Sequence, residues 1–150
     1  MLKKMITYTD YNGLERTEPF YFNLTKAEIL KMEFGSGGDL AEKLQRLVDS
    51  KKVRELMDFF NEFILKAYGE KSDDGIHFRK SSQISQDFEA SAAYNELYVE
   101  LLTDADKAAE FVKACLPAEI QKSAEFKLYL EESKTGKSLT NDHKSKVKSK

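Results

Sequence analysis

The pattern of apolar and polar positions divides the chain into a short β-rich part and a longer helical part. Residues 5–8 and 16–22 are β-prone, and Asp10-Tyr11-Asn12-Gly13 between them is typical of a turn, because Asn and Gly tolerate positive φ. These runs predict an N-terminal hairpin. Pro19 has no amide hydrogen, so its strand should lie at a sheet edge or carry a bulge there. The hairpin's edges could pair with another subunit unless helices cover them.

Apolar residues at helical spacing predict about six helices after the hairpin. The run Thr25-Lys26-Ala27-Glu28 matches a capping box, which should begin a short helix with Ile29 and Leu30 facing inward. Gly35-Ser36-Gly37-Gly38 should end this helix, because a glycine run interrupts helical structure. A second helix should start near Asp39.

The strongest helical pattern covers residues 53–68. Its stripe consists of Val53, Leu56, Met57, Phe60, Phe63, Ile64, Ala67 and Tyr68. Gly69 is placed to be the C′ residue of this helix. Residues 70–81 form a polar connection with Asp73-Asp74-Gly75 as its turn. One long helix should then extend from about residue 82 to residue 102.

Two more helices are predicted near the end of the apolar pattern. Thr103-Asp104 should cap a helix that ends near Cys115. Pro117 fits the first turn of a final helix, which would carry Ile120, Ala124, Phe126, Leu128 and Tyr129. We therefore expect an α+β fold, mostly α.

The folded part should be a single domain of residues 1–132, with the hairpin in 1–24 and the helices in 25–132. Apolar residues nearly vanish over residues 133–150, so this Lys-rich tail should be disordered. The tail holds six Lys and one Asp, whereas residues 1–132 hold 18 basic and 25 acidic residues. An acidic body argues against a nucleic-acid-binding domain, which needs basic surface against phosphates.

Composition also limits the compartment. No run of 18 apolar residues is present, so we expect no membrane span. The first residues lack the apolar stretch of a secretion signal. Cys115 is the only cysteine, which excludes an internal disulfide and fits a reducing cytosol.

No motif points to catalysis or to a bound cofactor. His77 and His143 lie far apart, and Cys115 has no His or Cys at ligand spacing. Asp73-Asp74-Gly75 lacks the ligand spacing of a calcium loop, and Gly35-Ser36-Gly37-Gly38 lacks the third glycine of a dinucleotide loop. Cys115 lies on an apolar helix face and should be an inert core thiol, and His77 should be a solvated surface residue. We expect no metal, no cofactor and no enzyme activity.

Candidate binding residues are apolar or aromatic side chains off the main helical stripes. They are Phe59, Leu65, Tyr94, Phe126 and Leu130. Core packing would explain these positions. If several are exposed together, they would instead form an interface with a partner or with another copy of the chain.

One segment resembles a linker of tail assembly chaperones from long-tailed phages of Gram-positive hosts. It reads Tyr68-Gly69-Glu70-Lys71-Ser72-Asp73-Asp74-Gly75-Ile76-His77-Phe78-Arg79-Lys80-Ser81. The likeness extends over residues 50–117, through Phe88, the runs Ala93-Tyr94-Asn95-Glu96-Leu97 and 101–112, and the closing Leu116-Pro117. Cys115 stands where such chaperones have a glycine.

The resemblance implies a chaperone that binds the tape measure protein in the host cytoplasm and keeps it soluble until the tail tube polymerises. It further implies a homo-oligomer, contact with the tail tube protein, and absence from the mature virion. The mechanism would be reversible helix-in-groove contact. The alternative is a regulatory binding module that uses the Lys-rich tail on nucleic acid, although that tail has no aromatic residue for base stacking.

Overall fold

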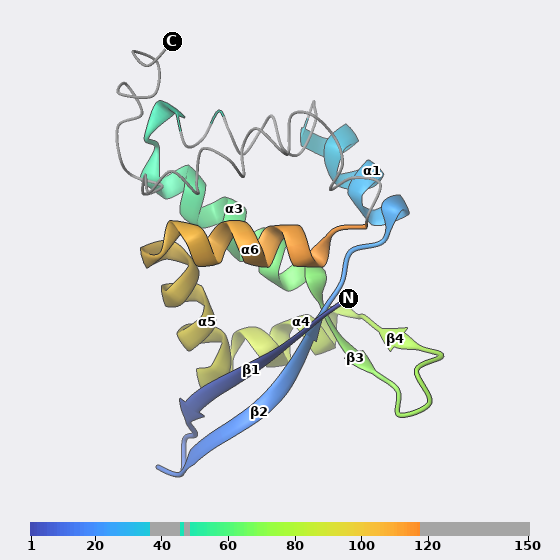
Figure 1. The fold of residues 1–150 in the computed structure, drawn as a ribbon, viewed down its shortest axis with the longest axis vertical. Coiled ribbons are helices and arrows are strands. Elements are labelled where there is room, and N and C mark those ends of the chain that lie inside the picture. Colours follow the sequence, from blue (N-terminus) through green and yellow to red (C-terminus); the bar gives the residue numbers. More distant parts are fainter. Residues whose placement is uncertain (37–45, 47–48, 118–150) are drawn as a thin grey trace.

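The computed structural model describes residues 1–36, 46 and 49–117. These residues form a four-stranded antiparallel sheet of order β1-β2-β3-β4 and five helices (Figure 1). The elements are β1 (Leu2–Thr9), β2 (Glu15–Phe22), α1 (Lys26–Ser36), α3 (Val53–Ala67), β3 (Tyr68–Lys71), β4 (Phe78–Arg79), α4 (Ser82–Glu89), α5 (Ala92–Thr103) and α6 (Ala105–Cys115). The predicted mostly helical α+β fold with an N-terminal hairpin is confirmed. The helix expected from Asp39, the helix expected after Pro117 and the tail lie outside the described residues.

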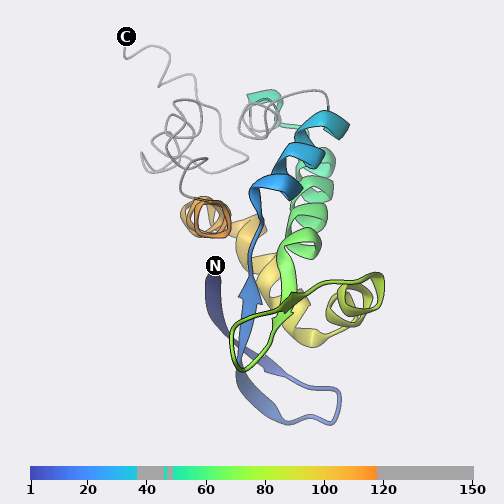
Figure 2. The same cartoon turned by 90° about the vertical axis from the view of Figure 1, so that its right-hand side faces the viewer.

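The β1–β2 hairpin follows the predicted turn. The Asp10 carboxylate accepts hydrogen bonds from the N–H groups of Asn12 and Leu14, both at 2.9 Å, and Gly13 has φ +87°. Pairing of β2 with β3 is confined to its last two residues, Tyr21 and Phe22. Pro19 therefore lies at an edge on that side, as predicted. The tip of this hairpin reaches beyond the helices in both views (Figure 1, Figure 2).

The predicted polar connection contains a second hairpin, β3–β4. Gly69 directly follows the C-cap residue Tyr68 and so stands at C′, as predicted, but it lies in β3 and does not have the left-handed conformation of a glycine cap. A Cβ at position 69 would lie 2.8 Å from the Phe78 ring and 2.9 Å from the Arg79 carbonyl oxygen, so glycine is needed for close approach. The turn at Gly75, with φ +78°, is confirmed.

The long helix predicted from residue 82 to 102 is two helices, α4 and α5. Ser91 separates them: its hydroxyl accepts the Tyr94 N–H at 3.2 Å and donates to the Phe88 carbonyl oxygen at 2.7 Å. The N-cap of α5 thus replaces the helical hydrogen bonds that a continuous helix would make here. The cap predicted at Asp104 for α6 is confirmed by its hydrogen bond from the Lys107 N–H.

The core lies between the sheet and the helices, with α5 against β1 and beside α3 and α6. Its fully buried large side chains are Phe22, Leu24, Ile29, Phe60, Phe63, Ile64, Leu97, Leu101 and Val112. Leu30 was expected inside but is 45% exposed, because it follows buried Ile29 by one residue and so faces about 100° away. Val53 and Met57 are also exposed, whereas Leu56 beside them is buried, so only part of the predicted stripe faces the core in the first turns of α3.

Candidate binding groove

A groove of about 960 Å³ lies between α1, α3 and α4. The side of α3 that faces it presents Phe59, Glu62, Phe63 and Lys66, which are spaced i, i+3, i+4 and i+7 along one helical face. Phe59 and Phe63 are 5% and 0% exposed and form an apolar floor. Half-buried Leu65 lies beside this face. The middle of α3 therefore serves both the core and the groove.

The wall formed by α4 is polar. Ser82, Ser85, Gln86 and Glu89 line the groove at i, i+3, i+4 and i+7, so one full face of this short helix is turned toward it. Ser81, the N-cap residue, accepts the Ile84 N–H at 3.1 Å and fixes where α4 begins. The opposite wall is α1, which contributes Glu28, Lys31 and Met32.

The end of α3 is tied to the starts of both walls. The last four carbonyl groups of a helix lack partners within the helix. In α3 each finds a donor: Ile64 from Tyr68 N–H, Leu65 from Ser85 Oγ, Lys66 from Lys80 Nζ, and Ala67 from Asn23 N–H. Asn23 and Lys80 belong to the segments that lead into α1 and α4, and Ser85 belongs to α4 itself, so α3 ends without a glycine cap.

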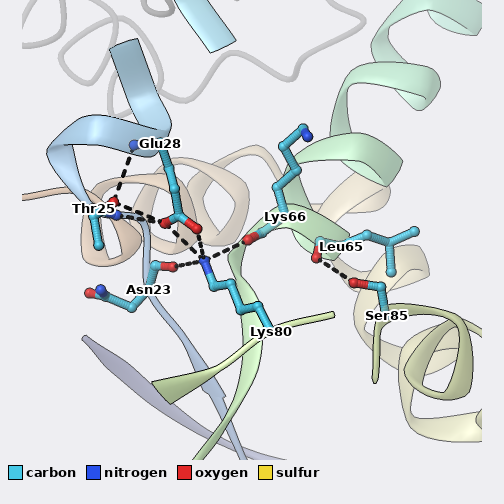
Figure 3. Close-up of polar contacts among 7 residues, drawn as sticks. All are labelled: Asn23, Thr25, Glu28, Leu65, Lys66, Lys80 and Ser85. Carbon is cyan, nitrogen blue, oxygen red and sulfur yellow. Dashed lines mark hydrogen bonds and ion pairs between the residues drawn. The ribbon is translucent and has the colours of Figure 1, made fainter. Parts of the chain in front are cut away.

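Lys80 is the centre of this arrangement (Figure 3). Its ammonium donates to the carbonyl oxygens of Asn23 and Lys66, both at 2.7 Å, and to the two carboxylate oxygens of Glu28, at 2.9 and 3.0 Å. Glu28 also completes the predicted capping box, since its carboxylate accepts the Thr25 N–H at 2.9 Å and its own N–H donates to Thr25 Oγ1 at 3.1 Å. One lysine therefore connects the segment after β2 with α1 and α3 at one end of the groove.

The charge state of Glu28 follows from these contacts. Partial burial alone would raise the pKa of its carboxyl, but the hydrogen bonds from Thr25 and Lys80 outweigh burial, and the pKa lies below its usual value. Glu28 is thus an anion paired with Lys80. In contrast, Lys31, Glu62, Lys66 and Glu89 have no side-chain ion-pair partner in the described part of the chain.

Two of the five predicted binding residues, Phe59 and Leu65, line the groove. Tyr94 lies next to it: its hydroxyl donates to the side-chain oxygen of Asn61, a lining residue, and its ring stacks on Tyr98. Burial raises the pKa of the Tyr94 hydroxyl. Phe126 and Leu130 lie outside the described residues.

The sequence interpretation missed the lining residues of α1 and α4, because they are polar. A stripe of polar residues at helical spacing, 82, 85, 86 and 89, was the available signal. Such a stripe also describes any solvated helix face, so it does not by itself indicate a groove.

The segment of residues 68–81 that carries the resemblance is mainly structural. The Tyr68 ring stacks on Phe88 at 4.0 Å between centroids, and Gly69 admits Phe78. Lys80 and Ser81 then place α4. The segment therefore positions the walls of the groove.

The described residues contain no group of three His, Cys, Asp or Glu side chains that could hold a metal ion. Cys115 is fully buried, as expected, and burial raises the pKa of its thiol. His77 is exposed, also as expected. Among the described helices, none has both the length and the apolar character to cross a membrane.

The fold and the groove define a small α+β protein with an open groove of mixed polar and apolar lining between three helices. The family model described as phage tail assembly chaperone matches residues 1–150, and the chain belongs to this family. No curated protein and no solved structure matches the chain.

Proposed function

We propose that this chain binds the tape measure protein of its phage and keeps it soluble during tail assembly, without making or breaking a covalent bond. The observation that carries the proposal is the match of residues 1–150 to phage tail assembly chaperones. The groove beside α3 supports it, because it offers apolar floor and polar walls in one open surface.

A physical need for such a protein follows from the chemistry of a long helical partner. An amphipathic helix without its final neighbours exposes an apolar stripe, which favours aggregation. Many copies of a small, acidic protein can cover successive stripes reversibly. The proposal includes self-association of the chain, action in the host cytoplasm, later contact with the tail tube protein and absence from the mature virion.

The test is co-expression of this chain with fragments of the tape measure protein from the same phage. We expect the fragments to move from the pellet to the soluble fraction and to co-purify with the chain. An unrelated acidic helical protein of similar size, expressed at the same level, is the control. Fragments that stay equally insoluble with and without the chain would contradict the proposal.

A further inference from the structure

We propose that the groove between α1, α3 and α4 is the surface on which an amphipathic helical segment of the tape measure protein docks. This inference rests on the proposed function and assigns its binding site.

The backbone of the walls favours a helical occupant. Most of the lining comes from three helices, whose interior backbone groups are bonded within each helix, and the last carbonyl groups of α3 are bonded to Asn23, Lys80 and Ser85. An extended peptide would find no strand edge there and would leave its own backbone groups unpaired. A helix brings its backbone hydrogen bonds with it, so it can enter at no such cost.

The size of the groove fits about two turns of a helix. A helix with side chains is roughly 10–12 Å wide and rises about 5.4 Å per turn, so two turns fill roughly 1,000 Å³. The groove measures about 960 Å³. Two helical turns bury less surface than a stable protein interface does. Such a small contact suits a chaperone that must later release its client.

The side chains specify the faces of that helix. The half-buried Leu65 and Met32, above the nearly buried Phe59, provide apolar contacts for a stripe at i, i+3 or i+4. The rim charges that have no ion-pair partner among the described residues carry both signs, Lys31 and Lys66 against Glu62 and Glu89. They therefore fit a helix that carries both Lys and Glu beside its apolar stripe. The carboxylates argue against a nucleic acid occupant, whose phosphates they would repel.

The experiment compares binding of labelled tape measure fragments to the full-length chain and to two groove variants. Leu65→Glu places a charge against the apolar stripe of the client. The double variant Glu62→Lys/Lys66→Glu exchanges two rim charges without changing the net charge. We expect each to weaken binding by at least about tenfold, measured by fluorescence anisotropy.

Each variant has a matched control. Val99→Glu makes a similar change at a side chain of α5 that is exposed and outside the groove. Arg54→Asp/Asp58→Arg exchanges two exposed charges four residues apart on α3, also outside the groove. We expect both controls to bind within about twofold of wild type. Thermal unfolding followed by circular dichroism verifies that all variants are folded.

The outcomes separate failure of the site from failure of the function. In wild-type protein, fragment-induced amide shifts in α1, α3 and α4 would support the groove. If the groove variants bind the fragments as tightly as wild type, the assignment of the groove as docking surface is overturned and the proposed function stands. If wild-type protein binds no fragment, both are overturned. Shifts in the groove that depend on chain concentration without any fragment would assign it instead to a second copy of the chain.

Discussion

Replacement of Lys80 by methionine tests the connection that this lysine makes between the segment after β2, α1 and α3. The variant keeps most of the aliphatic stem and removes only the ammonium. It therefore takes the donor from two carbonyl oxygens, of Asn23 and Lys66, and from the carboxylate of Glu28.

The expected loss of stability is about 2–3 kcal/mol. A hydrogen bond to a charged group contributes about 1.5–3 kcal/mol. The three contacts do not add fully, because they share one ammonium. The Lys80 side chain is also 21% exposed, so water can replace part of what is lost.

The pH dependence gives an independent readout. The folded-state pKa of Glu28 lies below its unfolded value of about 4.3, so the stabilisation from its ionised form is complete above that pH. It is lost as the pH falls through the lower folded-state pKa. In Lys80→Met the hydrogen bond that lowers this pKa is missing, so stability should fall less steeply with acid below about pH 4.3.

The assay is urea unfolding at neutral and acidic pH for wild type, Lys80→Met, Glu28→Gln and the double variant. Glutamine can still form a capping box with Thr25, so Glu28→Gln isolates the ion pair. Lys3→Met, on the exposed face of β1, is the control for loss of a surface lysine. A surface substitution usually changes the free energy of unfolding by less than about 0.5 kcal/mol. If Lys80→Met differs from wild type by no more than that, the proposed role of the Lys80 contacts is refuted.

Three further predictions concern the elements that frame the groove. Gly69→Ala should lower the free energy of unfolding by about 1–3 kcal/mol in urea titrations, because its Cβ would meet Phe78 and a backbone oxygen; an unchanged midpoint would contradict this. Ser91→Ala should cost about 1 kcal/mol in thermal unfolding, since the N-cap of α5 is lost; equal stability would mean that the cap does not separate the helices. The Cys115 thiol should resist a disulfide reagent until the protein is unfolded; fast labelling in native buffer would show that it is accessible.

Local signals predicted the elements whose stabilising contacts are close in sequence. The capping box of Thr25 and Glu28, the cap at Asp104 and the turn at Gly13 each depend on residues within a few positions. The β3–β4 hairpin could not be found in this way. Its β3 strand pairs with Tyr21 of β2, which is far away in the sequence. The segment itself is polar, so it lacks the alternation of a half-buried strand.

The break between α4 and α5 shows a different limit. Apolar residues continue at helical spacing across residues 90 and 91, so the pattern predicted one helix. Ser91 can be accommodated within a helix or cap a new one. The choice depends on tertiary packing: Phe88 stacks on Tyr68, whereas Tyr94 reaches Asn61 of α3. These two contacts draw the helices to different neighbours, and the serine hydroxyl replaces the hydrogen bonds lost between them.

The candidate site was predictable only on its apolar side. Phe59 and Leu65 lie off the main apolar stripe of α3 and border the groove, but Phe59 is also part of the buried core, so core packing explains its position as well. The walls are polar, and their positions depend on Lys80, a charged residue in a polar segment with no local pattern. The segment that resembles other tail assembly chaperones is this same stretch of residues 68–81. Within this stretch, Tyr68 stacks on Phe88 of α4 and Lys80 bonds to α1 and α3, whereas residues 73–77 are exposed. Under the proposed function, the side chains on the outward-facing rim of the groove are expected to determine which client binds. These side chains can vary without disturbing the contacts of Lys80.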